Sequence, residues 1–316
     1  MNNFTLYATA VLIWGSTWIL INYQIGSVAP EVSVVYRYAI ATVLLMGYAI
    51  FRGLRIKFSI RDHLQFVLLG VFLFSFNYIA TYTAQLYIAS ALNAVAFSTM
   101  VWMNILNARL FFGTRIEPKV WIGAGMGMAG IVILFWPEVS SMSFSDSTLV
   151  GVAFCLSGAL MASFGNMVSH RAQGKGMPVL QANAWGMFYG TLITALVAWR
   201  RGLAFNFEYT FEYVSSLIYL AVFGSIVAFG TYLKLMGRIG PAKAGYAVVM
   251  FPVVAFILSV MFEGLAIETH IVMGVVLVLL GNLVILGVSE IRNALRQWKR
   301  RIPDLFRKKE LVRKCH

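Results

Sequence analysis

The 316-residue chain has little charge and almost no cysteine or histidine. Only 12% of its residues are charged, against roughly 25% in an average soluble domain, whereas 60% are hydrophobic. The two cysteines are Cys155, within a long apolar segment, and Cys315, near the C-terminus, so we expect no disulfide. The four histidines are never paired at a metal-ligand spacing. The sequence also has no zinc-protease, serine-hydrolase or phosphate-loop motif, so we expect neither an enzyme nor a bound cofactor.

What the sequence has instead is a series of long apolar segments. A membrane-spanning helix needs roughly 20 mostly apolar residues to cross the hydrocarbon layer. Ten segments meet this requirement, and the polar spacers between them are short. They lie near 4–25, 31–51, 64–84, 88–112, 119–136, 148–170, 178–199, 212–235, 241–262 and 270–289. We therefore predict an all-α membrane protein with ten transmembrane helices.

The positions of the positive charges predict the orientation of these helices. Of the 25 Lys and Arg residues, 22 fall in alternate spacers and in the C-terminal tail. Arg200 and Arg201 fall on the opposite side, and Arg37 lies within an apolar segment. By the positive-inside rule both termini are cytoplasmic, and we expect a multi-pass protein of the inner (plasma) membrane. The net charge of +13 is thus explained by the orientation of the helices in the membrane, and we expect no nucleic-acid partner.

The C-terminal tail, 290–316, carries ten of these basic residues. Ile291, Leu295, Trp298 and Ile302 recur among them at intervals of three or four residues. This pattern predicts a basic amphipathic helix on the inner leaflet. Such a helix binds anionic lipid with about 1 kcal/mol for each nearby basic residue.

The apolar part of the chain contains an internal repeat. Shifting the sequence by 151 residues superposes the fourth and fifth segments on the ninth and tenth. The matching pairs include Gly113 with Gly264, Glu117 with Glu268, Gly123 with Gly274, and Gly130 with Gly281. We predict two five-helix halves, 1–137 and 148–289, joined by a polar linker. Because five is odd, the second half enters the membrane from the opposite side, which makes the halves an inverted pair.

Several short motifs resemble those of the drug/metabolite transporter superfamily, specifically its EamA-type ten-helix transporters. They are Trp14-Gly15-Ser16-Thr17-Trp18, Pro30 with Arg37, Leu86-Tyr87 with Ala91 and Ala94, Gly240-Pro241-Ala242-Lys243-Ala244 with Pro252, and the glycines of both fifth helices. The resemblance covers essentially residues 1–289. It implies a transporter that moves small metabolites, often outward, amino acids among them.

The sequence departs from the family pattern at the end of the fourth helix of each half. The family usually has a Gly-Glu pair there, but here Thr114 follows Gly113 and Leu265 follows Gly264. Glu263 instead precedes its glycine. These departures leave the subfamily and any coupling role of the glutamates open.

Arg37 is the one basic residue expected inside the membrane. It lies six residues after Glu31, about 9 Å below the outer boundary at 1.5 Å per residue. A central arginine costs ~2.5–3.5 kcal/mol on insertion scales, so it should face a partner, the bundle interior or water. Two interpretations remain: a contact for an anion or carboxylate in a transport pathway, or snorkelling and hydrogen bonds to helix-end carbonyls.

Polar and aromatic side chains within the predicted helices indicate a central cavity. Aromatic rings can stack on an apolar substrate while amides and hydroxyls fix its polar end. The alternative is that these side chains form interface belts and interhelical hydrogen bonds. The residues that we expect to bind substrate are Trp14, Thr17, Arg37, Tyr78, Tyr82, Trp102, Asn166 and Tyr232.

The fifth segment contains Gly125, Gly127 and Gly130 in the spacing of a dinucleotide-binding fingerprint. That motif requires a strand before it and a helix after it. Within an apolar segment the same spacing of small residues predicts close helix packing instead.

Taken together, these features predict a secondary transporter that exports a small organic metabolite, such as an amino acid, by alternating access. The competing hypothesis is a polytopic protein that does not transport, such as a lipid-modifying enzyme or a receptor-like scaffold. The expected partners are a small-molecule substrate and membrane lipid. A monomer is the working expectation for the oligomeric state.

Overall fold

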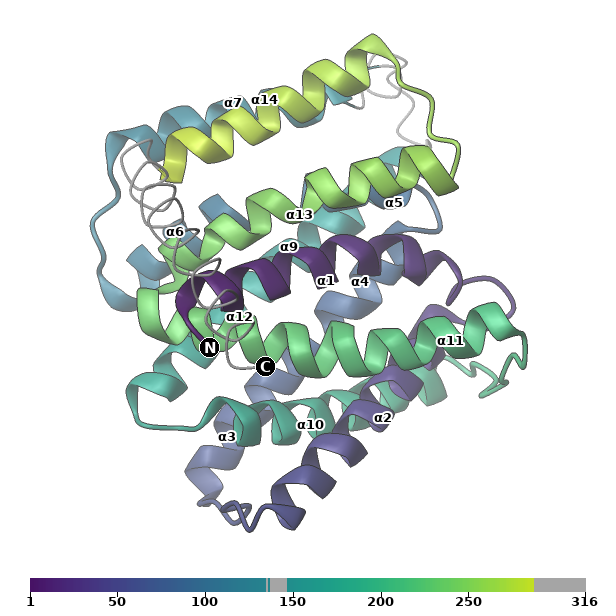
Figure 1. Cartoon of the computed structure of the whole chain (residues 1–316), viewed down its shortest axis with the longest axis vertical. Coiled ribbons are helices and arrows are strands. Elements are labelled where there is room, and N and C mark those ends of the chain that lie inside the picture. Colours follow the sequence, from purple (N-terminus) through teal and green to yellow (C-terminus); the bar gives the residue numbers. More distant parts are fainter. Residues whose placement is uncertain (135, 137–146, 287–316) are drawn as a thin grey trace, which may run out of the picture.

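The computed structural model describes residues 1–134, 136 and 147–286, and every regular element in this part of the chain is a helix (Figure 1). The all-α prediction is thereby confirmed. The predicted tail helix and most of the predicted linker lie outside the described residues. The elements are α1 (Asn3–Asn22), α2 (Pro30–Phe51), α3 (Ile60–Leu69), η1 (Gly70–Phe76), α4 (Asn77–Ala84), α5 (Ser90–Phe97), α6 (Met100–Phe112), α7 (Pro118–Leu134), α9 (Ser147–Gly174), α10 (Val179–Arg200), α11 (Phe211–Tyr219), η2 (Leu220–Val227), α12 (Ala228–Ile239), α13 (Pro241–Phe262) and α14 (Thr269–Leu286).

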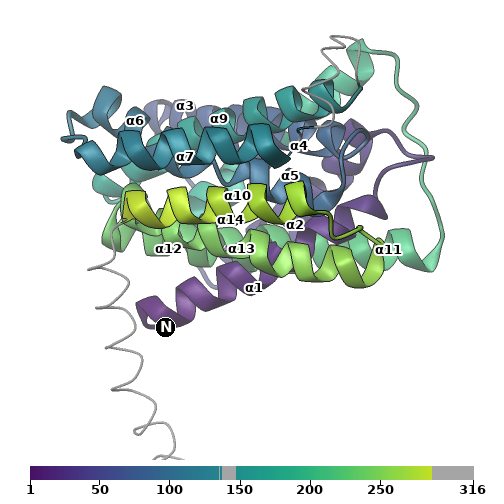
Figure 2. The same cartoon turned by 90° about the horizontal axis from the view of Figure 1, so that it is seen from above.

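Six helical stretches of the described residues are long and apolar enough to cross a membrane. They are Asn3–Asn22, Pro30–Phe51, Ile60–Ala84, Ser90–Phe112, Ser147–Gly174 and Phe211–Ile239. Shorter apolar helices cover Trp121–Leu134, Met250–Phe262 and Thr269–Gly281. The helices run roughly along one common direction in both views, as a membrane bundle requires (Figure 2).

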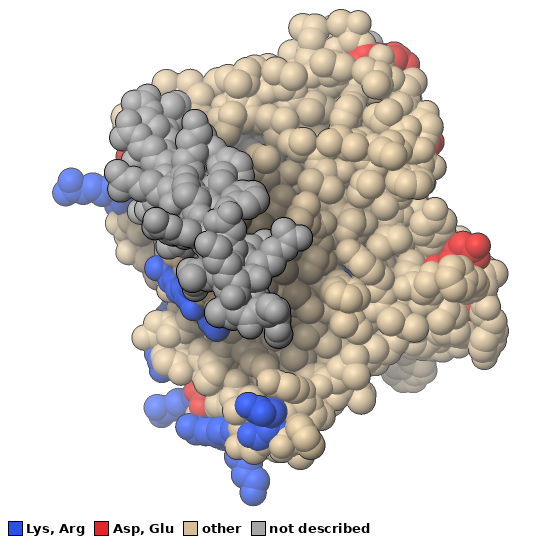
Figure 3. All heavy atoms as spheres, viewed as in Figure 1, with Lys and Arg blue, Asp and Glu red and all other residues tan. Residues whose placement is uncertain are grey.

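Charged side chains gather at the two ends of this bundle. On the face shown in Figure 3, Lys and Arg lie mainly at one end, most Asp and Glu lie at the other, and the surface between them is uncharged. This separation is what two water-exposed ends and an intervening lipid-exposed band produce.

Local signals in the sequence set several helix ends. The Asn2 side chain caps α1 by accepting a hydrogen bond from the Thr5 backbone N–H at 2.9 Å. Ser59 and Asp62 form a capping box at α3, in which the Ser59 backbone N–H and hydroxyl both donate to the Asp62 carboxylate. Gly113 ends α6 with a left-handed φ of 68°, and Gly264 has a φ of 66° just after α13. The repeated glycines therefore mark equivalent left-handed turns.

Two π-helical segments interrupt the third and eighth predicted spans at corresponding places. Segment η1 starts at Gly70 and η2 starts at Leu220, so their starting positions differ by 150 residues. Each segment carries a buried serine that bonds to a distant helix. Ser75 accepts a hydrogen bond from the Thr194 hydroxyl at 2.8 Å, and Ser225 accepts one from Nε of Arg37 at 2.9 Å. π-Helical turns are rare and frequently occur at functional sites.

Helices from distant parts of the chain pack together throughout the bundle. Helix α1 packs against α12 and α13, and α9 packs against η1, α4 and α6. Helix α10 packs against α2, α3 and η1, and α2 also packs against η2. Helices α7 and α14 form a separate pair at one edge of the molecule (Figures 1 and 2).

Glycines make the α7–α14 contact close, which confirms that the glycine-rich run of the fifth segment serves helix packing. A Cβ atom at Gly281 would lie 2.5 Å from the Gly123 carbonyl oxygen and 2.9 Å from the Gly127 backbone nitrogen. A Cβ atom at Gly274 would lie 2.7 Å from the Leu134 backbone. Only glycine permits this approach.

We therefore expect Gly274→Ala to lower the free energy of unfolding by about 1–3 kcal/mol, because the added methyl group meets backbone atoms that cannot yield locally. Thermal unfolding of the purified protein in detergent measures this effect. Gly125→Ala is the matched control, since a Cβ there meets nothing within 4 Å. The control should be neutral, or stabilising by up to ~1 kcal/mol from helix propensity. Equal effects of the two substitutions would contradict the packing role.

Candidate functional site

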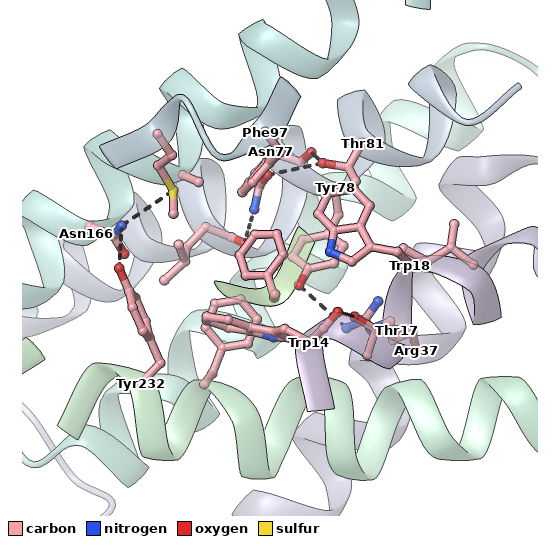
Figure 4. A pocket seen from close by; sticks show the side chains of 16 residues that line it. Trp14, Thr17, Trp18, Arg37, Asn77, Tyr78, Thr81, Phe97, Asn166 and Tyr232 are labelled. Atoms are coloured by element: carbon pink, nitrogen blue, oxygen red, sulfur yellow. Dashed lines mark hydrogen bonds between the residues drawn. The ribbon is translucent and has the colours of Figure 1, made fainter. Parts of the chain in front are cut away.

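A cavity of about 60 Å³ lies in the middle of the bundle, between helices from both parts of the chain (Figure 4). Every lining residue except Trp14 is buried in the bundle. It is lined by Trp14, Thr17, Trp18, Ile21, Arg37, Leu73, Asn77, Tyr78, Thr81, Phe97, Met100, Ala162, Asn166, Phe229, Tyr232 and Phe251.

Arg37 supplies the positive charge of this cavity. Its side chain is 1% exposed, and its partners are neutral. Nε donates to the Ser225 hydroxyl at 2.9 Å, Nη1 to the Tyr82 hydroxyl at 3.2 Å, and Nη2 to the Tyr78 hydroxyl at 3.5 Å. The guanidinium carbon also lies 4.6 Å from the centre of the Tyr78 ring, within cation–π range. The structure therefore rules out snorkelling and bonds to helix-end carbonyls as the explanation of Arg37.

The π-helical segment η2 shapes the pocket around this guanidinium. The Gly224 carbonyl accepts a hydrogen bond from Nε1 of Trp14 at 3.1 Å. A Cβ atom at Gly224 would lie 3.0 Å from Nη2 of Arg37 and 2.9 Å from Cγ2 of Thr17. Gly224 thus leaves room for the arginine, while the adjacent Ser225 holds its Nε.

A neutral polar cluster lies at another part of the cavity, at the left of Figure 4. The Asn166 amide nitrogen donates to Oδ1 of Asn104 at 3.2 Å and to the Tyr232 hydroxyl at 3.5 Å. All three residues are at most 1% exposed. Asn166 and Tyr232 line the cavity, whereas Asn104 supports them from outside its lining.

Aromatic rings form much of the wall between the arginine and this cluster. The Trp14 ring lies 4.9 Å from Tyr232 and 5.0 Å from Phe229, centre to centre. The Trp18 ring stacks on Phe251 at 5.7 Å, with an angle of 24° between the planes. Such rings bind flat or apolar groups through their faces and edges.

A hydrogen-bond network lies next to the Trp18 backbone. The Gln85 amide nitrogen donates to the Trp18 carbonyl at 2.9 Å and to Oδ1 of Asn22 at 3.0 Å. The Asn22 amide and the Ser259 hydroxyl both donate to the Glu263 carboxylate. The ends of α1, α4 and α13 are joined by this network.

The structure brings together most of the residues predicted from the sequence. Trp14, Thr17, Arg37, Tyr78, Asn166 and Tyr232 all line the cavity. Tyr82 does not line the cavity, but its hydroxyl accepts a hydrogen bond from Arg37, which does.

Trp102 does not line this cavity. Its Nε1 would lie 3.9 Å from a Cβ atom at Gly127, so the indole faces α7. Met100, two residues earlier on α6, does line the cavity. Two residues turn an α-helix by about 200°, which places Trp102 on the opposite face.

Sequence analysis missed Gly224 and Ser225, which act on the site through η2. Their one visible signal is that Ser75 and Ser225 occupy equivalent positions in the two π-helical segments. The cavity offers no metal site, because the described residues contain no cluster of three His, Cys, Asp or Glu side chains. What the arrangement can do chemically is hold a small molecule that has polar ends and an apolar middle.

The environment of Arg37 makes a clear prediction about stability. Because the charge is buried against neutral groups, we expect Arg37→Met to leave the free energy of unfolding unchanged within about 1 kcal/mol or to raise it. Thermal unfolding in detergent measures this. A loss of ~3 kcal/mol or more would show that Arg37 is there for stability.

Arg201 provides the contrasting variant. It pairs with the carboxylate of Glu31, whose side chain is 4% exposed. Arg201→Met leaves that buried carboxylate without its cation, so the free energy of unfolding should fall by about 1–3 kcal/mol.

Comparisons with known proteins agree with this architecture. The model of the EamA-like transporter family matches residues 4–136 and again 149–287. The "Uncharacterized inner membrane transporter YedA" of Escherichia coli K12 is 28% identical over 291 residues, which are 88% of this chain and 90% of the relative. The "Uncharacterized transporter YoaV" of Bacillus subtilis is 22% identical over 276 residues, 86% of this chain and 92% of the relative.

A solved crystal structure has a TM-score of 0.66 to this fold, with 18% sequence identity. The match covers 89% of this chain and 94% of the solved chain, so the similarity extends over the whole helical bundle. The relatives are named as transporters, and the described helices include six that are suited to crossing a membrane. The chain is therefore a membrane protein that belongs to the EamA-like transporter family.

Proposed function

We propose that the protein is a secondary transporter that moves a small organic metabolite across the inner membrane by alternating access. The observation that carries this proposal is the central cavity, which is lined by residues of both parts of the chain. Arg37, Tyr78 and Asn77 come from the first part, and Asn166 and Tyr232 come from the second. A site that two rigid bodies share can open to either side when they rock about it.

The two bodies would be the five-helix halves 1–137 and 148–289, related as inverted repeats. Several features support this division. The family model matches one range in each half. The π-helical segments and the left-handed glycines recur at spacings of 150 and 151 residues. Contacts are also reciprocal, since η2 of the second half binds Arg37 of α2 while η1 of the first half binds Thr194 of α10.

The orientation and partners follow from charge. Both termini would be cytoplasmic, because most Lys and Arg lie at one end of the bundle. The basic tail, 290–316, would bind anionic lipid of the inner leaflet. The outward direction of transport rests on resemblance to the family, and we propose that the protein acts as a monomer without a cofactor or a nucleic-acid partner.

Flux through the purified protein tests the proposal. Proteoliposomes should take up or release at least one member of a metabolite panel, with the effect of a pH gradient measured in parallel. Protein-free liposomes, and liposomes containing heat-denatured protein, are the controls. The absence of flux for all organic acids, amino acids, sugars and nucleotide derivatives would favour a protein that does not transport, such as a lipid-modifying enzyme or a scaffold.

Alternating access makes a second prediction that needs no known substrate. In a background without Cys155 and Cys315, Ala162→Cys places a thiol in the cavity wall. We expect a membrane-impermeant maleimide to label this thiol from either side of the membrane, because each open state exposes the cavity to one side.

The control is Ala159→Cys, one turn away on the same helix. Ala159 is fully buried and does not line the cavity, so its thiol should resist labelling from both sides. Labelling of the Ala162→Cys thiol from one side only would contradict alternating access, even if the protein binds small molecules.

A further inference from the structure

The charge of the cavity is not balanced by the protein. No carboxylate of the described residues lies within ion-pairing distance of the Arg37 guanidinium, and none lines the cavity. An arginine side chain cannot lose its proton in a protein, so this site keeps a positive charge. A buried cation without a counter-ion is costly, and an anionic ligand would remove that cost.

The guanidinium also has N–H groups that donate no hydrogen bond to the described residues. An arginine side chain has five N–H groups. The structure uses three of them, one each from Nε, Nη1 and Nη2, for Ser225, Tyr82 and Tyr78. The two terminal nitrogens therefore each retain one N–H. A planar carboxylate is the group that paired guanidinium donors fit best.

The rest of the cavity accepts an apolar body. Its lining on the third predicted span runs from Leu73 to Thr81, and on α1 from Trp14 to Ile21. At 1.5 Å per residue these stretches are about 10–12 Å long. The aromatic wall over this length suits a ring or a short hydrocarbon chain, which a simple inorganic anion lacks.

The cluster of Asn166, Tyr232 and Asn104 can recognise a neutral polar group. Its side chains are two amides and a hydroxyl, which are hydrogen-bonded to one another. Asn166 and Tyr232 line the cavity, so a hydroxyl or carbonyl group of the ligand would form hydrogen bonds with this amide and this hydroxyl. A cationic group would find no carboxylate among the described lining residues.

We propose that the substrate is an organic monocarboxylate with an aromatic or apolar body and a neutral hydrogen-bonding group at its far end. Arg37 binds the carboxylate, the aromatic wall contacts the body, and the Asn166–Tyr232 cluster binds the far end. An α-amino acid is disfavoured, because its ammonium group lies next to its carboxylate and therefore close to Arg37. This inference rests on the proposed function and narrows its substrate class.

A matched set of ligands tests this assignment by isothermal titration calorimetry on the full-length protein in detergent. The probes are 3-(4-hydroxyphenyl)propanoate, its primary amide, 3-phenylpropanoate, and tyrosine. The first has all three features, the amide lacks the charge, 3-phenylpropanoate lacks the far hydroxyl, and tyrosine adds an ammonium group. We expect the first to bind at least about tenfold more tightly than the amide or tyrosine, and several-fold more tightly than 3-phenylpropanoate.

Two substitutions tie this preference to the site. Arg37→Gln should weaken binding of the carboxylate at least about tenfold and leave the amide unaffected. Arg37→Lys retains the charge without the paired donors, so its affinity should fall between these values. Thermal unfolding confirms that each variant is folded.

Gly224→Ala tests the geometry without changing any charge. Its methyl group would lie 3.0 Å from Nη2 of Arg37, so we expect the carboxylate to bind about tenfold more weakly. Gly230→Ala is the matched control, because a Cβ there meets nothing within 4 Å.

The proposal is overturned if no carboxylate binds, if the amide or tyrosine binds as tightly as the acid, or if Arg37→Gln leaves the affinity unchanged. Flux separates this failure from that of the proposed function. Selective binding of the acid without flux would support the ligand class and contradict transport. Flux of neutral or amino compounds that does not depend on Arg37 would support transport and contradict the ligand class.

Discussion

The constraint on which this molecule depends is the confinement of one positive charge inside an apolar bundle. Arg37 lies on α2, yet the groups that hold it come from elsewhere: Tyr78 and Tyr82 from α4, and Ser225 from η2. Ser225 lies in the π-helical turns of the eighth span. Its neighbour Gly224 has no side chain that would collide with the guanidinium. Helices from both parts of the chain thus surround the guanidinium, and the cavity lies between these helices.

The same structural devices recur in both parts of the chain. Each π-helical segment presents a serine to a helix of the other part, and left-handed glycines follow α6 and α13 at the same spacing as the sequence repeat. The recurrence is not exact. The counterpart of the Ser225–Arg37 bond is the neutral contact between Ser75 and Thr194, so only one of two similar positions carries a charge. The single charged position among these recurring features gives the cavity its polarity.

Much of this could be predicted from the sequence, because membranes impose strong rules. The all-helical fold follows from apolar segments near 20 residues long, and the role of the α7 and α14 glycines follows from their small-residue spacing. Individual side chains were predicted where polarity inside a span is costly, as for Arg37, Asn166 and Tyr232. Trp102 lies on the face of α6 opposite to Met100, outside the cavity lining. Gly224 and Ser225 were missed because π-helical turns leave no compositional signal.

The central claim is that the protein binds a carboxylate at Arg37 in the central cavity and moves it across the membrane. Counterflow tests it most directly: proteoliposomes loaded with unlabelled 3-(4-hydroxyphenyl)propanoate should accumulate the labelled compound transiently from outside. The account predicts this overshoot for the wild-type protein and its loss in Arg37→Gln, with both proteins equally folded. An overshoot of equal size in Arg37→Gln, or none in the wild-type protein, would contradict it.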